Sequence, residues 1–94
     1  MSDVIDQAVS ELNTKLGGSY DGSAKFVIPG EGSIVMDESG ARESDDDAEV
    51  TMTADTETFR DILDGNLDPT TAFMTGRLKI DGDMGQAMKL ASAL

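Results

Sequence analysis

The side chains that could carry chemistry in this sequence are almost all carboxylates. The chain holds 19 Asp and Glu residues against seven Lys and Arg residues, with no His and no Cys. Histidine is the usual general base near neutral pH and cysteine is a common nucleophile, so two frequent routes to catalysis are missing. Serine nucleophiles lack a histidine partner, which leaves only a serine–lysine pairing open. The residue types therefore predict that the chain is not an enzyme.

Paired carboxylates, which glycosidases use, arise by chance where acidic residues are this frequent. A glycosidase also needs a deep cleft with aromatic walls, whereas this sequence has three Phe, one Tyr and no Trp. We therefore interpret the acidic pairs as ordinary surface charges.

Two acidic clusters supply the oxygen atoms that calcium prefers. Asp45, Asp46 and Asp47 are consecutive, so their side chains diverge. Asp81 and Asp83 are better spaced, but no glutamate follows at the position that a calcium loop requires. We expect no metal site, and we expect Asp83 to cap a helix instead.

Methionine is the unusual apolar residue of this chain. Five of the six methionines lie on predicted apolar faces: Met36, Met52, Met74, Met84 and Met88. The methionine side chain is flexible and polarizable, which suits irregular gaps in a core and equally suits a wall that adapts to different apolar ligands. Periodicity alone favours the core interpretation, and the ligand wall is the alternative.

The elements that position these side chains are expected to form one domain, residues 1–94, because too little sequence remains for a second core. The chain begins with an apolar stripe that is typical of an amphipathic helix: Val4, Ile5, Ala8, Val9, Leu12 and Leu16. Ser2 or Asp3 is the expected N-cap, and Gly17 and Gly18 are expected to end the helix.

Short apolar runs after this helix predict strands. Two strands are expected over 24–28 and 34–36, joined by a hairpin at 29–32. An exposed edge strand over 41–44 and a half-buried strand over 48–53 follow. The glycine-rich hairpin lacks the third glycine and the following helix of a dinucleotide fingerprint, so no cofactor is expected.

Two short helices, a strand and a final helix complete the chain. Asp55 and Asp68 are expected helix caps, because aspartate accepts hydrogen bonds from free amides and Pro69 suits the first helical position. A strand carries Leu78 and Ile80. The last helix has an apolar stripe of Met84, Ala87, Met88, Ala91 and Leu94. This order of helix, three or four strands, two short helices, strand and helix predicts an α+β fold.

Charge and hydropathy restrict the partners and the location. The formal net charge of −12 repels phosphate backbones and anionic membranes, so nucleic acid is not an expected partner. No run approaches the ~18 apolar residues of a membrane span, and the first residues lack the features of a secretory signal. We therefore expect a cytoplasmic protein without stable membrane insertion.

Residues 68–90 read DPTTAFMTGRLKIDGDMGQAMKL. This segment resembles the closing segment of the sterol carrier protein family, in which a proline-led turn, a glycine, a strand, a Gly-Asp turn and a helix follow one another. The matching residues are Pro69, Ala72, Phe73, Met74, Gly76, Arg77, Leu78, Lys79, Ile80, Gly82, Asp83, Ala87 and Leu90. Residues 48–68, including Phe59 and Gly65, are similar to the strand and helix that precede it. The resemblance covers roughly residues 20–94.

The resemblance implies a five-stranded, mostly antiparallel sheet covered by helices and enclosing an apolar tunnel or cavity. It also implies that this cavity holds a lipid, which could be a sterol, a fatty acid, an acyl chain or a phospholipid. Such a domain is a carrier and not a catalyst. The chain is expected to be a small stand-alone, bacterial-type member of the family.

The cavity wall is expected to come from large apolar side chains: Phe26, Ile34, Met36, Met52, Phe73, Met74, Leu78, Ile80, Met84, Met88 and Leu94. The alternative is a protein-interaction module whose apolar groove is filled by a partner subunit, such as a second copy in a homodimer. No motif specifies a site for a lipid head group. Arg77, Lys79 and Lys89 are cationic candidates, although each fits a solvated surface charge as well.

Overall fold

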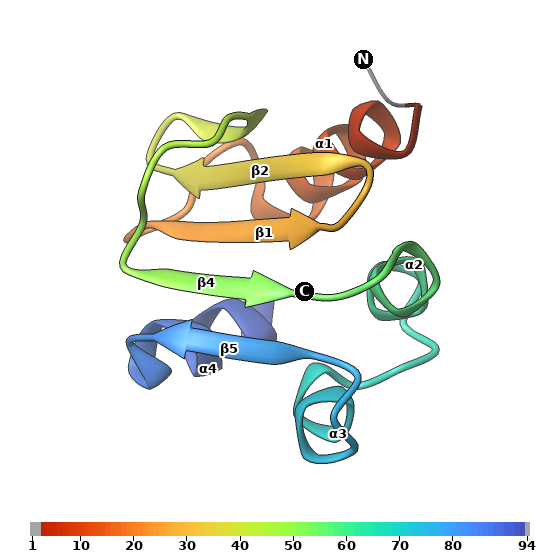
Figure 1. Cartoon of the computed structure of the whole chain (residues 1–94). Coiled ribbons are helices and arrows are strands. Elements are labelled where there is room, and N and C mark those ends of the chain that lie inside the picture. Colours follow the sequence, from red (N-terminus) through yellow and green to blue (C-terminus); the bar gives the residue numbers. More distant parts are fainter. Residues whose placement is uncertain (1–2, 94) are drawn as a thin grey trace.

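The structure is a computed structural model that describes residues 3–93. Its elements, in chain order, are α1 (Asp3–Leu16), β1 (Ala24–Ile28), β2 (Gly32–Asp37), β3 (Gly40–Glu43), β4 (Val50–Thr53), α2 (Thr56–Leu63), α3 (Pro69–Met74), β5 (Lys79–Gly82) and α4 (Met84–Ala93) (Figure 1). This order confirms the predicted α+β fold. Within residues 3–93, none of the helices has the length and apolarity to cross a membrane.

The strands form one five-stranded sheet in the order β3-β2-β1-β4-β5. Neighbouring strands are antiparallel except β1 and β4, which run parallel. The parallel pair arises because the chain after β3 passes the ends of β2 and β1 before it enters β4 on their far side (Figure 1). The expected five-stranded, mostly antiparallel sheet is confirmed, and β5 forms one of its two edges.

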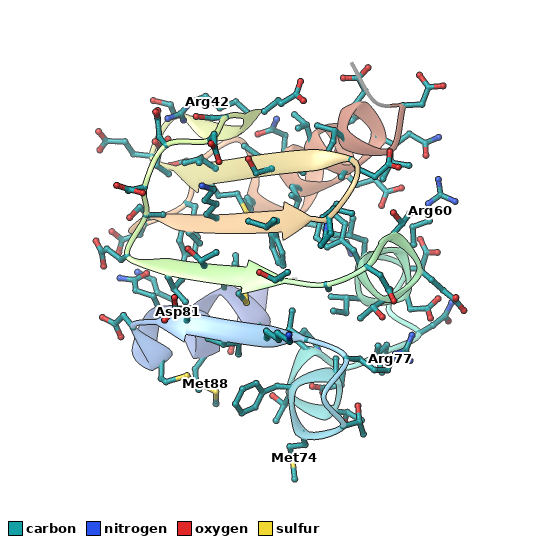
Figure 2. All side chains as sticks on the ribbon, in the orientation of Figure 1. Arg42, Arg60, Met74, Arg77, Asp81 and Met88 are labelled. Atoms are coloured by element: carbon teal, nitrogen blue, oxygen red, sulfur yellow. The ribbon has the colours of Figure 1, made fainter. Side chains whose placement is uncertain are left out.

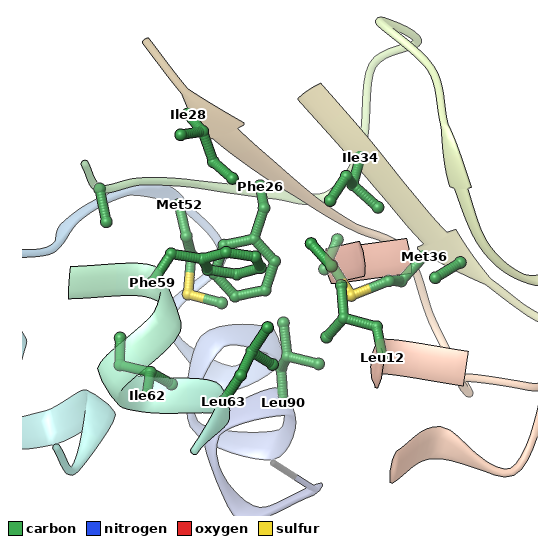
Figure 3. Close-up of a cluster of buried hydrophobic side chains, with 14 of the residues drawn as sticks. Leu12, Phe26, Ile28, Ile34, Met36, Met52, Phe59, Ile62, Leu63 and Leu90 are labelled. Atoms are coloured by element: carbon green, nitrogen blue, oxygen red, sulfur yellow. The ribbon is translucent and has the colours of Figure 1, made fainter. Parts of the chain in front are cut away.

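The helices cover one face of this sheet and bury a single apolar core against it. Helix α1 contacts β2 and β3, and helix α4 contacts β1, β4 and β5. Alternate strand residues point into the core: Ala24, Phe26, Ile28, Ile34, Met36, Ala41, Val50 and Met52. Helix residues meet them from the other side, including Leu12, Phe59, Ile62, Leu63 and Leu90 (Figure 3).

Three aspartates begin the later helices as predicted. Asp55 and Asp68 are the N-caps of α2 and α3, and their carboxylates accept hydrogen bonds of 2.8 and 2.7 Å from first-turn amides. Asp83 accepts a hydrogen bond of 2.8 Å from an amide at the start of α4. These bonds satisfy donors that have no partner inside a helix, so local sequence fixes where each helix starts.

The structure excludes one of the two predicted N-caps of α1 and corrects the predicted start of the last strand. Asp3 lies within α1 and so is not its N-cap, while Ser2 lies outside the described residues. The last strand begins at Lys79 and not before Leu78, because the Leu78 amide donates a hydrogen bond to the Ala72 carbonyl at 3.1 Å. This bond holds Leu78 in the turn after α3, with its side chain buried.

Candidate functional site

An apolar groove lies at the β5 edge of the sheet, between α3 and α4. Its lining residues are Met52, Pro69, Thr70, Phe73, Leu78, Ile80, Met84, Ala87, Met88 and Ala91. Only one of them, Thr70, has a polar side chain. The free volume is about 30 Å³, far below the ~300–1,000 Å³ of typical ligand pockets.

One row of side chains runs across the sheet and ends at the groove, which Met52 and Ile80 line. Ile34, Phe26, Met52 and Ile80 are paired in register on β2, β1, β4 and β5. The first three are at most 2% exposed, whereas Ile80 on the edge strand is only half-buried. The groove is therefore the place where the core reaches the edge of the sheet.

Helix α4 forms one wall with one of its two apolar stripes. The predicted stripe does face the groove, because Met84, Ala87, Met88 and Ala91 all line it. Met84 and Met88 are 45% and 57% exposed there. The second stripe contains Leu90, which is fully buried in the core; the predicted periodicity left this residue out, whereas the family resemblance included it among the matching residues.

Helix α3 forms the opposite wall and is weakly anchored. Of its six residues, only Ala72 is buried. Phe73 lines the groove and is 42% exposed. Met74 is 78% exposed and points away from the rest of the molecule (Figure 2).

The structure brings six of the predicted wall residues together at this groove: Met52, Phe73, Leu78, Ile80, Met84 and Met88. Phe26, Ile34 and Met36 lie instead within the core, because helices α1 and α2 cover that part of the sheet (Figure 3). Met74 projects into solvent, and Leu94 lies outside the described residues. That any of these residues contacts a ligand stays a prediction.

Four groove residues were absent from the predicted wall. Ala87 and Ala91 lie one turn apart on the same stripe as the methionines, so helical periodicity could have identified them. Pro69 and Thr70 begin α3, and no sequence signal shows that the start of this helix turns toward β5.

Polar contacts hold the far side of α4 to the loop before β1. The Tyr20 hydroxyl donates a hydrogen bond to the Gln86 carbonyl oxygen at 3.1 Å and lies 3.0 Å from Gln86 Oε1. Lys89 Nζ forms an ion pair with Asp21 at 3.0 Å and lies 5.6 Å from the centroid of the Tyr20 ring. Burial raises the pKa of the Tyr20 hydroxyl, and nearby carboxylates add to this shift, so the donor stays protonated.

A second hollow, of about 230 Å³, lies between α1 and α2. Its lining mixes apolar residues with charges of both signs: Val4, Gln7, Ala8, Glu11, Phe59, Arg60, Leu63 and Asp64. Such a lining suits water better than an apolar chain, because buried charges need polar partners.

The acidic clusters have other partners. Asp45 is paired with Lys25 at 2.8 Å, and the hydrogen bond from Lys25 holds the pKa of the Asp45 carboxyl below its ordinary value. Asp83 caps α4. In the part of the chain that the structure describes, no three His, Cys, Asp or Glu residues are arranged to hold a metal ion.

Sequence comparison identifies relatives across nearly the whole chain. The model of the SCP-2 sterol transfer family matches residues 7–94. Hydroxysteroid dehydrogenase-like protein 2 of Homo sapiens is 47% identical over 88 residues, which cover 94% of this chain and 20% of that protein. The chain thus spans about a fifth of the length of the curated relatives that it matches.

Solved structures share the fold. Sterol Carrier Protein 2 Like 2 from Aedes aegypti has a TM-score of 0.79 at 19% identity, covering 97% of this chain and 96% of that chain. Sterol Carrier Protein-2 from the same organism, solved in complex with the C16 fatty acid palmitate, has a TM-score of 0.76 at 24% identity and covers 100% and 99% of the two chains. At these identities the likeness concerns the fold alone. Together with the match of the family model over residues 7–94, it shows that this chain belongs to the SCP-2 sterol transfer family.

Proposed function

We propose that this chain is a non-catalytic lipid carrier that takes an apolar chain into the groove between α3 and α4. The observation that carries this proposal is the lining of the groove, which is apolar except for Thr70 and continues the core from Met52 to Ile80. The complex of the Aedes aegypti protein with palmitate supports the same class of ligand.

The groove must widen to admit such a ligand, because its free volume is about 30 Å³. Helix α3 is the wall better able to move, since only Ala72 anchors it in the core. Helix α4 is fixed more firmly, by Leu90 in the core and by the hydrogen bond from Tyr20. We therefore propose that a ligand enters by displacing α3 outward from β5.

The expected affinity is modest. Burying ~10 methylene groups at ~0.8 kcal/mol each contributes ~8 kcal/mol, and association costs at least ~4 kcal/mol. The net binding free energy of ~4 kcal/mol corresponds to a dissociation constant of about 1 mM. Further burial of the exposed methionines lowers this constant toward about 1 μM. From the apolar groove alone, tighter binding is not expected.

Native mass spectrometry of freshly purified protein, followed by titration with a fluorescent fatty acid or sterol, tests the proposal. Met88→Gln places a polar group in the groove and should weaken binding by about tenfold, because a ligand would bury the exposed 57% of a side chain whose full burial contributes ~1.5–3 kcal/mol. Met74→Gln is the matched control on the solvent side and should bind as the unsubstituted chain does. A protein that carries no lipid and fails to bind either probe at high micromolar concentration would contradict the proposal.

A second candidate is an interaction module whose groove is filled by another copy of the chain. It is favoured by one observation: the large apolar side chains that are exposed within residues 3–93 all lie on α3 and α4, namely Phe73, Met74, Met84 and Met88. In sedimentation experiments at rising concentration, Met88→Gln should then weaken self-association, because Met88 lines the groove. A monomer with bound lipid would rule this candidate out.

The proposed carrier is not an enzyme, which the lack of His and Cys supports. The dehydrogenase names of curated relatives describe whole proteins, of which this chain matches about a fifth. Turnover of a hydroxysteroid with a nicotinamide cofactor by the purified chain would contradict this part of the proposal. The cytoplasmic location stays a prediction, which cell fractionation would check.

A further inference from the structure

We infer that Lys79 anchors the carboxylate of an acyl ligand at the β5 edge, so that the groove selects fatty acids over uncharged lipids of equal length. This inference rests on the proposed function, because it concerns the head group of a ligand whose chain occupies the groove. It adds a residue and a ligand class to that site.

The position of Lys79 follows from the alternation along β5. Ile80 faces the groove, so its neighbour Lys79 faces the opposite side of the sheet, where it is paired with Thr53 of β4. An open hollow of about 550 Å³ lies there, lined by Thr51, Thr53, Phe73, Gly76, Leu78, Lys79, Ile80 and Asp81.

This hollow and the groove border the same side chains at the edge strand. The two share Phe73, Leu78 and Ile80, so an acyl chain over Ile80 would end beside Lys79. Within residues 3–93, no further strand pairs with the outer edge of β5 and blocks this path. Thr51 and Thr53 also line this hollow, and a threonine hydroxyl can donate a hydrogen bond to a carboxylate.

Lys79 is also the basic residue of this region that is free to bind an anion. Arg77 already donates to Thr58 at 3.2 Å and pairs with Asp61 at 3.4 Å. Lys89 is paired with Asp21 on the far side of α4. Lys79 is exposed, and within residues 3–93 it makes no ion pair.

Asp81 limits which anion can bind. It lies two residues along the same face of β5, paired with Thr51, and borders the same hollow. Its carboxylate repels a second negative charge, so a ligand with a single charge is favoured over a phosphate that carries nearly two. A carboxylate is a singly charged head group that an ammonium and two hydroxyls can recognise together.

The test is competition of hexadecanoic acid and hexadecan-1-ol against a bound fluorescent probe, with the full chain. Exposed ion pairs of this kind change affinity by up to about fivefold. We expect Lys79→Gln to weaken the binding of hexadecanoic acid by up to about that factor and to leave the affinity for hexadecan-1-ol unchanged. Lys79→Arg should keep both affinities. Asp81→Asn should change the affinity for the acid in the opposite direction and strengthen it.

Lys15→Gln is the matched control, because Lys15 is an exposed lysine on α1, remote from β5. It should alter neither affinity. The inference is overturned if Lys79→Gln weakens both ligands equally or neither, or if Lys15→Gln weakens the acid to the same extent. If the unsubstituted chain binds neither ligand, the proposed function fails as well, whereas retained binding of the alcohol without any effect of Lys79 overturns this inference alone.

Discussion

The rings of Phe26 and Phe59 lie 4.6 Å apart between centroids, at an interplanar angle of 57°. This pair joins β1 to α2 through the centre of the core, beside Met52 (Figure 3). Both rings are about 1% exposed. Phe26 belongs to the row that Met52 and Ile80 continue to the sheet edge, where the apolar groove lies.

Truncation of Phe26 tests this arrangement. Phe26→Ala removes the contact with Phe59 and leaves a cavity in the core, so the free energy of unfolding should fall by about 3–5 kcal/mol. Denaturation with urea measures the change. Met74 is 78% exposed, so the free energy of unfolding of Met74→Ala should stay within about 0.5 kcal/mol of the value for the unsubstituted protein. Equal stabilities of the two variants would show that Phe26 is not a core residue.

The elements were predictable because their signals are local. Asp55, Asp68 and Asp83 each bind amides within three residues, and the alternation of Ala24, Phe26 and Ile28 is visible in the sequence. No tertiary information is needed to recognise such caps and strands.

The site was only partly predictable, because it depends on long-range arrangement. Phe26, Met52 and Ile80 each alternate with polar or less apolar neighbours, so the sequence does not distinguish them. Ile80 alone of the three is half-buried, because β5 lies at the sheet edge. Likewise, Met88 and Leu90 both lie on apolar stripes of α4, and packing against the sheet decides which one is buried. The pattern of residue types alone does not show which of these apolar residues is buried and which is exposed.

Filling the groove should block the ligand without unfolding the protein. Ala91 lines the groove on α4, so the indole of Ala91→Trp would occupy the space between α4 and α3. We expect loss of probe binding, with a melting temperature within a few degrees of the unsubstituted value. Ala93→Trp is the matched control, because Ala93 is exposed on the same helix and does not line the groove. Probe binding that survives Ala91→Trp would place the ligand elsewhere.

Removing the Tyr20 hydroxyl should loosen α4. Tyr20→Phe deletes the hydrogen bond to Gln86, which contributes about 0.5–1.5 kcal/mol, so amides of α4 should exchange faster with deuterium. The raised pKa of Tyr20 predicts a further difference at alkaline pH. The folded state favours the protonated hydroxyl of Tyr20. The stabilisation that results is present below the ordinary pKa near 10, and it is lost as pH rises through the higher pKa of the folded state. Tyr20→Phe should lack this alkaline loss, and identical pH profiles would contradict the assignment.

The cap of α2 should make stability depend on acid pH. The hydrogen bond from the Thr58 amide, with one from its side chain, holds the pKa of Asp55 below its ordinary value of 3.8. A lowered folded pKa means that the carboxylate stabilises the fold above the ordinary value, and this stabilisation is lost as pH falls through the folded value. Asp55→Asn retains a capping oxygen but does not titrate. The difference in free energy of unfolding between the two proteins should therefore be constant near neutral pH and should change below about pH 4 in favour of the variant. Charge repulsion among the other acids is shared by both proteins and largely cancels, so a difference that stays constant down to strongly acid pH would show that the Asp55 carboxylate does not act as the cap.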